Sequence, residues 1–238
     1  MLNLSIVFPV YNEEKRLKKT LPLLKKFLKE NKKKNVEIIF ISDGSHDLTN
    51  SIIHKFVFTN STKFKIRFIK YQNNIGKGYA IKTGVLNSKN KWILICDIDF
   101  SVHPNQFLIW KKNGLINQNY TSYFGSREHK SSKIKTSKFR VFLGFFFKKI
   151  IKILFDINLS DTQCGFKVFN KSYSKKIFGK LKSYRFAFDI ELILLLKKHN
   201  ISIKELPLNW SHKSGSKISL FRDIPMMLFD LITIKFRN

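Results

Sequence analysis

The chain has 238 residues, of which 43% are hydrophobic and 26% charged, a composition that argues against wholesale disorder and allows one large domain or two small ones. Its formal net charge is +29, which indicates either attraction to polyanions or the residue bias of an AT-rich genome. Neither the aromatic motif of RNA-binding domains nor zinc-finger spacing accompanies the charge, so nucleic acid is not an expected partner.

The sequence predicts neither a signal peptide nor a transmembrane helix. The first strand-like run begins almost at Met1, and no charged-then-apolar segment precedes Leu4. No run reaches the roughly 20 apolar residues that a bilayer-spanning helix needs. Cys96 and Cys164 lack metal-ligand spacing, and free thiols in a reducing cytoplasm are their simplest interpretation.

The first half of the chain alternates strand-like and helix-like segments. Strands are predicted at Leu4–Phe8, Val36–Ile41, Ile66–Ile69 and Trp92–Cys96, and helices at Glu13–Lys29, Asp47–Phe58 and Gly76–Leu86. This rhythm is typical of the α/β class, with a mostly parallel central sheet flanked by helices, an architecture that often binds nucleotides.

Three loops at predicted strand ends carry groups suited to a nucleotide. Pro9-Val10-Tyr11-Asn12-Glu13 opens a helix, whose free N–H groups suit an anion or a polar base edge. In Ser42-Asp43-Gly44-Ser45, the carboxylate of Asp43 can accept from a uracil imide or from ribose hydroxyls. Asn74-Ile75-Gly76-Lys77-Gly78 adds glycines for close backbone approach and the positive charge of Lys77. Each loop alone also fits an ordinary helix cap.

The run from Trp92 to Asp99 ends in two carboxylates, Asp97 and Asp99, spaced i, i+2. Residues two apart on an extended chain point the same way, about 6.6 Å apart. Both side chains are therefore expected at the carboxyl end of a strand, where open α/β sheets bind ligands. Two hard oxygen ligands suit Mg²⁺ or Mn²⁺. A solvated turn is the alternative interpretation of the pair alone.

The second half is less regular. The polar stretch from His129 to Lys138 is expected to be an exposed mobile loop. Phe139–Phe155 has a Phe-rich face and a lysine face, which favours an interfacial helix on an anionic membrane surface over a core-packing helix. Leu220–Phe236 fits either a second surface-lying helix or a packed terminal helix. The expected location is therefore peripheral, on the cytoplasmic side of a membrane.

Together these motifs resemble the family 2 glycosyltransferases, inverting enzymes with a GT-A type nucleotide-sugar-binding fold and a DxD metal site. Asp161-Thr162-Gln163-Cys164-Gly165-Phe166-Lys167, Phe186-Ala187-Phe188-Asp189-Ile190-Glu191-Leu192, and Asn209-Trp210-Ser211 with Gly215-Ser216-Lys217 look like the polyprenyl-phosphate (dolichyl-phosphate) β-glucosyltransferases of that family. The corresponding mannose synthases share the plan but match less well. The resemblance covers nearly the whole chain and implies one GT-A domain over residues 1–238, with a nucleotide-sugar half (1–125) and an acceptor half (126–238).

The resemblance also implies a role for each matching residue. The donor side would hold UDP-glucose through Pro9, Tyr11, Glu13, Asp43, Lys77, Asp97 and Lys217. Of these, Asp97, together with Asp99, would hold the Mg²⁺ or Mn²⁺. The acceptor side would hold the phosphate of a polyprenyl phosphate through Ser126, Arg127, Asp161, Gln163 and Lys167. Ser42 departs from the pattern, since the family usually has an aspartate there.

The implied reaction is displacement of UDP from the sugar's anomeric carbon by a lipid phosphate oxygen. A phosphate monoester has a second pKa near 6 and is largely dianionic at pH 7, so it needs no general base. Cations such as Arg127 and Lys167 would position it instead. Asp189 is then a general base, an organiser of those cations, or a helix cap.

Two further hypotheses remain open. One is a family 2 enzyme that uses another nucleotide sugar or a saccharide hydroxyl as acceptor. The other, from a different class, is a non-catalytic basic protein that binds membrane or nucleic acid.

Overall fold

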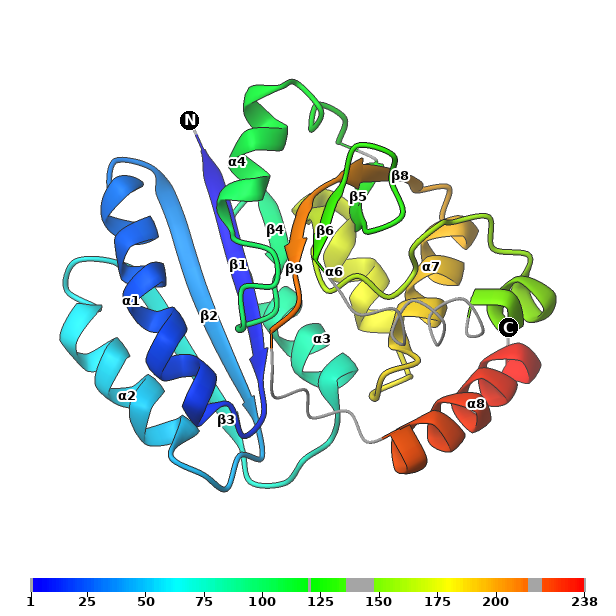
Figure 1. The fold of residues 1–238 in the computed structure, drawn as a ribbon, viewed down its shortest axis with the longest axis horizontal. Helices are drawn as coiled ribbons and strands as arrows, with labels where there is room; N and C mark the ends of the chain where they lie inside the picture. The colour runs from blue at the N-terminus through cyan, green and yellow to red at the C-terminus, as the bar shows by residue number, and fades with distance from the viewer. Residues whose placement is uncertain (1, 120, 136–147, 214–219, 238) are drawn as a thin grey trace.

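A seven-stranded sheet crosses the molecule in the order β3-β2-β1-β4-β7-β5-β8, with helices on both faces (Figure 1). The computed structural model describes residues 2–119, 121–135, 148–213 and 220–237. The strands are β1 Asn3–Val10, β2 Asn35–Asp43, β3 Lys65–Tyr71, β4 Trp92–Ile95, β5 Thr121–Ser126, β6 Lys133–Lys135, β7 Lys167–Asn170, β8 Ser202–Pro207 and β9 Asn209–Ser211. The labelled helices are α1 Glu14–Glu30, α2 Thr49–Asn60, α3 Lys77–Asn87, α4 Asn105–Lys112, α6 Lys171–Lys180, α7 Phe188–Lys198 and α8 Leu220–Arg237, and residues 148–155 are also helical.

The sheet is mixed but mostly parallel, which confirms the predicted class. Strands β3, β2, β1 and β4 pair in parallel, and so do β5 and β8. Only β7 among the strands of this sheet runs antiparallel to its neighbours, β4 and β5. The strands predicted in the first half are all present, with ends shifted by a few residues.

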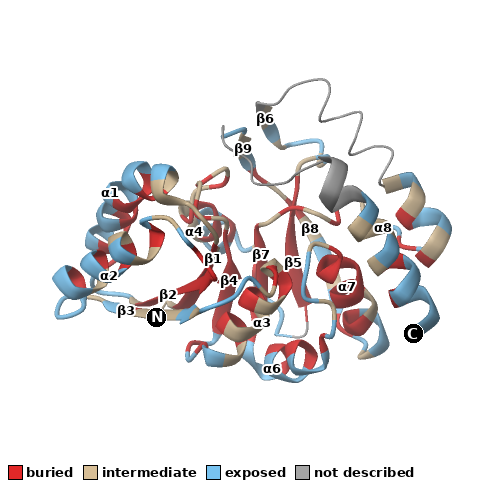
Figure 2. Ribbon diagram, turned by 90° about the horizontal axis from the view of Figure 1, so that it is seen from below, coloured by how far each residue is buried: buried red, intermediate tan, exposed pale blue. Residues whose placement is uncertain are grey.

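Alternating apolar residues give the sheet two buried faces, seen as the red central strands in Figure 2. In β1, Leu4, Ile6 and Phe8 pack in one core with helices α1, α2 and α4. Val7 points the other way, into a second core formed with α3, α6 and α7. Period-two alternation in a strand places successive side chains on opposite faces, so hydrophobic runs on both faces produce a three-layer arrangement.

The polar stretch after His129 is more ordered than the sequence predicts. Lys133–Lys135 forms β6, which pairs in parallel with β9 in a second, two-stranded sheet. The prediction of an exposed loop over His129 to Lys138 is therefore wrong at this strand. The partner strand lies more than seventy residues further along the chain, and local polarity does not reveal it.

The predicted interfacial helix is only partly described, because residues 139–147 lie outside the described residues. In the helical part, 148–155, Ile151 and Phe155 pack in the second core, whereas Ile153 is 74% exposed. This part therefore contacts the core on one side and solvent on the other.

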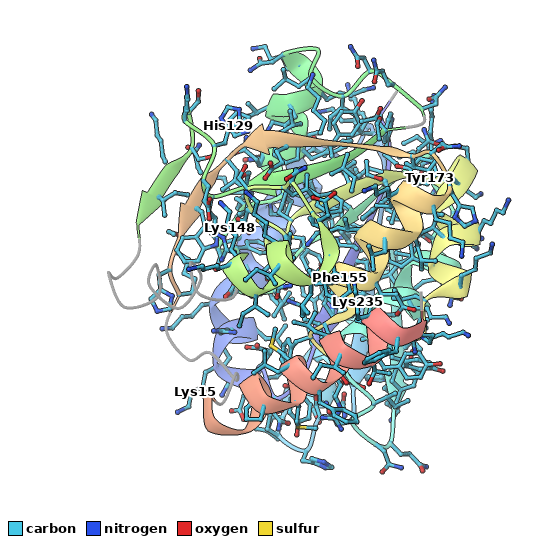
Figure 3. All side chains as sticks on the ribbon, turned by 90° about the vertical axis from the view of Figure 1, so that its right-hand side faces the viewer. Lys15, His129, Lys148, Phe155, Tyr173 and Lys235 are labelled. Atoms are coloured by element: carbon cyan, nitrogen blue, oxygen red, sulfur yellow. The ribbon has the colours of Figure 1, made fainter. Side chains whose placement is uncertain are left out.

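Helix α8 packs against the core on one face, as the packed terminal helix among the two alternatives would, and its other face is exposed. Leu231 and Ile234 are fully buried, while Phe229, Ile232 and Phe236 are 70%, 50% and 88% exposed. The helix lies beside 148–155, and Lys235 Nζ sits 5.9 Å from the ring centre of Phe155 (Figure 3). Within the described part of the chain, no helix is long and apolar enough to cross a bilayer.

Gly84 in α3 allows that helix to approach β1 closely. A Cβ there would lie 2.2 Å from Cγ1 of Val7. We expect Gly84→Ala to lower the free energy of unfolding by about 1–3 kcal/mol, because the core must shift to admit the methyl group. Urea denaturation measures this loss. Gly179→Ala is the matched control, since nothing lies within 4 Å of its added Cβ, and an unchanged Gly84→Ala midpoint would contradict the prediction.

Candidate functional site

A cavity of about 310 Å³ opens at the carboxyl ends of β1, β2 and β4, at the lower edge of the sheet in Figure 1. Nine of the residues singled out from the sequence line it: Pro9, Tyr11, Glu13, Asp43, Lys77, Asp97, Asp99, Arg127 and Gln163. They come from six separate segments of the chain. Among the described residues, the structure therefore brings the expected donor residues and part of the expected acceptor residues to one place.

Hydrogen bonds join the loop after β1 to the loop after β2 and to the start of α2. Asn12 has a positive φ of 51°, and its Oδ1 accepts from the backbone N–H of His46 at 2.8 Å. The backbone N–H of Glu13 donates to Thr49 Oγ1 at 2.7 Å. These bonds satisfy polar groups around the start of α1 and keep Tyr11 and Glu13 at the cavity.

Asp43 is buried at the end of β2, and its carboxylate organises the third loop. Its Oδ1 accepts from the N–H of Ile75 at 2.8 Å, and its Oδ2 accepts from the N–H of Gly76 at 2.8 Å and from Nδ2 of Asn74 at 2.9 Å. Burial raises the pKa of Asp43, and the two backbone donors oppose that rise. A carboxylate has about four acceptor positions, so one remains for a ligand.

Asp97, Asp99 and Lys77 form a charged cluster on the cavity wall. Lys77 Nζ lies 2.7 Å from Oδ1 of Asp97, and Asp99 Oδ2 lies 3.7 Å from Nη2 of Arg16. Burial by itself lowers the pKa of Lys77, but the Asp97 carboxylate outweighs that effect and raises the pKa above its usual value. Lys77 is therefore a fixed positive charge at neutral pH.

The donor set at this cluster fits a small divalent cation held partly by a ligand. Within the described residues there is no group of three His, Cys, Asp or Glu side chains that could hold a metal ion. Two carboxylates are nevertheless enough for Mg²⁺ or Mn²⁺ when phosphate oxygens and waters complete the shell. Gly165 makes room for one of them, since a Cβ there would lie 2.1 Å from Asp97 Oδ2.

Arg127 is held against the cavity by Asp161. Its Nε and Nη2 donate to the two Asp161 oxygens at 2.7 and 2.8 Å, and its backbone N–H donates to Oδ2 at 2.9 Å. Burial alone would raise the pKa of Asp161, but the Arg127 guanidinium holds it below its usual value. Asp161 is buried and absent from the cavity wall, so it positions Arg127 and does not itself face a ligand.

Lys167, Asp189 and Ser126 also lie behind the cavity and not on it. Lys167 is 1% exposed, and its Nζ donates to Asp189 Oδ1 at 2.8 Å and to the carbonyl of Cys164 at 2.6 Å. Burial raises the pKa of Asp189 while the Lys167 ammonium opposes the rise. Ser126 is fully buried. The expectation that Lys167 faces the acceptor directly is therefore wrong: its side chain is buried behind the cavity, and its ammonium group pairs with Asp189.

Lys217 lies outside the described residues. The helix-cap interpretation of Asp189 is wrong, because α7 has Ala187 at its N-cap and no side chain caps it.

Several cavity residues have no individual role predicted from the sequence. They are Arg16, Asn74, Ser101, Arg185, Trp210, His212 and Lys213. The ring centre of Trp210, in the Asn209-Trp210-Ser211 motif, lies 6.0 Å from the Arg127 guanidinium carbon. Arg16 sits one helical turn beyond Glu13, and its Nη1 lies 2.8 Å from Glu13 Oε1. A basic residue at i+3 of a helix start was the available signal for it.

Comparison with curated proteins finds relatives along almost the entire chain. A dolichyl-phosphate β-glucosyltransferase from Dictyostelium discoideum is 35% identical over 243 residues, covering 98% of this chain and 74% of the relative. The human and Saccharomyces cerevisiae proteins of the same name are each 33% identical, also over 98% of this chain, and 75% and 74% of their own lengths are covered.

Solved structures share the fold at low sequence identity. Glucosyl-3-phosphoglycerate synthase from Mycobacterium tuberculosis, in complex with Mn²⁺, UDP-glucose and glycerol 3-phosphate, aligns with a TM-score of 0.67 at 15% identity, covering 98% of this chain and 78% of that one. The mannosyltransferase PcManGT from Pyrobaculum calidifontis, in complex with GDP-mannose and Mn²⁺, aligns with a TM-score of 0.63 at 11% identity. The alignment covers all of this chain and 64% of the mannosyltransferase chain. These neighbours support the GT-A type fold.

The model of the family described as "Glycosyl transferase family 2" matches residues 5–178. That span begins within β1, ends within α6 and contains Asp43, Lys77, Asp97, Asp99 and Arg127. The chain belongs to glycosyl transferase family 2.

Proposed function

We propose that this enzyme transfers glucose from UDP-glucose to a polyprenyl phosphate of the dolichyl type and forms a β-linked lipid-phosphate sugar. The observation that carries the proposal is the cavity wall, where Asp97, Asp99 and Lys77 face the same space as Arg127 and Gln163. The two carboxylates, which could hold a metal ion, and the ammonium of Lys77 together suit the diphosphate of a nucleotide sugar. The guanidinium of Arg127 is a separate positive charge that suits a second phosphate group. The relatives named above support the choice of glucose and of a lipid phosphate.

The reaction exchanges one bond at the anomeric carbon. A phosphate oxygen of the acceptor forms a bond to C1 as the bond from C1 to the UDP oxygen breaks, and UDP leaves with that electron pair. Attack from the face opposite UDP inverts the configuration, which gives the β product from an α-linked donor. Lys77 would stabilise the charge that develops on the leaving diphosphate.

Mg²⁺ or Mn²⁺, held by Asp97 and Asp99, would supply further electrostatic stabilisation of the diphosphate. Arg127 would hold the acceptor phosphate, with its geometry fixed in advance by Asp161. Asp189 does not line the cavity and is engaged by Lys167. That position supports the role of an organiser over that of a general base, in keeping with an acceptor that is already ionised.

We also propose peripheral binding to an anionic membrane surface through α8. Phe229, Ile232 and Phe236 follow one another at i, i+3 and i+7 and are 50–88% exposed. Basic residues surround this stripe: Lys235 and Arg237 on α8, and Lys149 and Lys152 on the neighbouring helix, are all exposed. An apolar stripe beside cations suits a bilayer interface. Helix α8 also contacts a residue of the cavity wall: Arg185 lines the cavity, and its Nη1 lies 4.0 Å from Met226 Sδ of α8.

Donor and acceptor can be identified in one assay. We expect organic-phase label from UDP-[¹⁴C]glucose with a polyprenyl phosphate, and none from UDP-galactose, GDP-mannose or a saccharide acceptor. Label from GDP-mannose would favour a mannose synthase-like enzyme, and transfer to a saccharide would favour the other acceptor class. Asp97→Ala should abolish transfer, and near-normal turnover in that variant would contradict the donor site. Salt-sensitive DNA binding without any transfer would favour a non-catalytic protein.

The metal site can be tested without turnover. Electron paramagnetic resonance can measure Mn²⁺ binding in the presence of UDP. We expect this binding to weaken at least about tenfold in Asp97→Asn and in Gly165→Ala. The second variant keeps both carboxylates but forces Asp97 away, because the new methyl group would overlap it. Gly179→Ala, which adds a methyl group in open space, should bind normally. Unweakened binding in Asp97→Asn would exclude that carboxylate as a ligand.

If α8 binds the membrane, the protein should float with lipid vesicles, and specific substitutions on α8 should reduce that flotation. With vesicles that contain anionic lipid, the triple variant Phe229→Ser, Ile232→Ser, Phe236→Ser should bind at least about tenfold less, because burial of each large side chain contributes on the order of 1.5–3 kcal/mol. Phe58→Ser is the control, since Phe58 is 79% exposed but lies on α2. Equal flotation of the triple variant and the control would exclude α8 as the docking surface.

A further inference from the structure

Glu205 is a carboxylate that does not line the cavity, yet it binds the segment that positions Arg127. It lies on β8, opposite Phe124 of β5 in the register of the two strands, which are neighbours in Figure 1. Its Oε2 accepts from the N–H of Ser160 at 2.9 Å and from Ser160 Oγ at 2.6 Å, and its Oε1 accepts from the N–H of Asp161 at 2.9 Å. Both oxygens are therefore used to fix two consecutive residues.

The segment fixed by Glu205 carries Asp161 and Gln163. Asp161 holds the Arg127 side chain and backbone through three hydrogen bonds of 2.7 to 2.9 Å. Asp161 Oδ1 also accepts from the N–H of Gln163 at 3.2 Å. The side chain of Gln163 lines the cavity, and its buried Nε2 has no hydrogen-bond partner among the described residues. A free amide donor beside a fixed guanidinium is suited to oxygen atoms of a ligand.

We infer that Glu205 is a positioning residue for acceptor binding: it fixes the backbone at Ser160 and Asp161, so that Arg127 and Gln163 are held ready for a phosphate group. The inference rests on the proposed function only for the identity of that phosphate. Without a partner, the Arg127 side chain could adopt other rotamers, because it is 37% exposed. Its geometry depends on Asp161, and the backbone position of Asp161 depends on Glu205.

A carboxylate is needed at position 205 because three donors converge on it. In Glu205→Gln, one oxygen becomes an NH₂ group, which meets an N–H of Ser160 or Asp161 donor to donor. That N–H then loses its acceptor, and the segment must move to find another. The change keeps the size of the side chain, so the effect of the lost charge and acceptor is separated from that of a cavity.

We expect Glu205→Gln to raise KM for the acceptor phosphate roughly tenfold, since the loss of a charge-assisted hydrogen bond is about 1.5 kcal/mol. KM for the nucleotide sugar should change less than twofold, because Asp43 and Lys77 are held by other contacts. Glu128→Gln is the matched control. Glu128 follows Arg127 directly, but its carboxylate pairs with Lys148 and not with residues 160–161, so this variant should keep both KM values.

A double-mutant cycle separates positioning from general destabilisation. If Glu205 acts through Arg127, then Glu205→Gln should cost little further acceptor affinity in an Arg127→Ala background. The same tenfold loss in both backgrounds, or an equal rise of both KM values in the single variant, would overturn the inference.

A readout that needs no turnover keeps this test independent of the proposed function. In ¹⁵N-labelled protein, the Arg127 Nε–H, assigned by its disappearance in Arg127→Lys, should exchange slowly with solvent because it donates to Asp161. Glu205→Gln should speed that exchange, and Glu128→Gln should not. Unchanged exchange in Glu205→Gln would overturn the inference. If Glu205→Gln speeds the exchange but the protein transfers no sugar to lipid phosphate, the positioning role of Glu205 is supported and only the proposed function is contradicted.

Discussion

The antiparallel pairing of β7 with β4 is the constraint on which the rest of the site depends. β7 begins at Lys167, which lies opposite Ile95 at the end of β4. The segment before β7 therefore reaches the sheet at the same edge where β4 delivers Asp97. Gly165 ends up so close to the Asp97 carboxylate that an added methyl group would overlap it. A parallel strand in this place would have brought that segment to the opposite edge, away from Asp97.

Buried charge is the second organising feature, and each buried charge in the described site has a partner. The Lys167–Asp189 and Arg127–Asp161 pairs each join a cation to a carboxylate within 2.8 Å. Removing an ion from water costs several kcal/mol, so such pairs contribute little net stability unless they are well hydrogen-bonded. Their value here is in geometry, because they fix groups behind and beside the cavity. Asp189 also adds to the negative field that keeps Lys77 protonated.

The sequence predicted the first half of the fold and that most of the residues expected to bind a donor would lie together. The reason is local: Asp43, Lys77 and Asp97 each follow or open a strand or helix with clear hydrophobic periodicity, and parallel strands deliver their ends to one edge. The second half depends on pairings distant in sequence. The contacts of β6 with β9 and of β8 with β5 leave no local pattern, so strands there were missed.

The same limit explains what was misjudged in the site. Lys167 is the last residue of the Asp161–Lys167 motif, and the resemblance implies a role facing the acceptor. Its alternation within β7 points it instead into the interior beside Asp189. Likewise, the Phe139–Phe155 pattern did not show that Ile151 and Phe155 would meet a core formed by distant helices. A motif identifies residues that belong together, but the pairing of strands decides which of them reaches the cavity.

The three hydrogen bonds that Asp43 accepts from Asn74, Ile75 and Gly76 are already present without any ligand. Two loops from different strands are thus joined to each other before any ligand binds. Ordering a loop during binding costs affinity, whereas ordering it during folding does not. The part of the cavity next to Asp43 is preorganised in this sense. The entropy cost of ordering these two loops is part of the folding of the chain and does not lower the affinity for a ligand that contacts them.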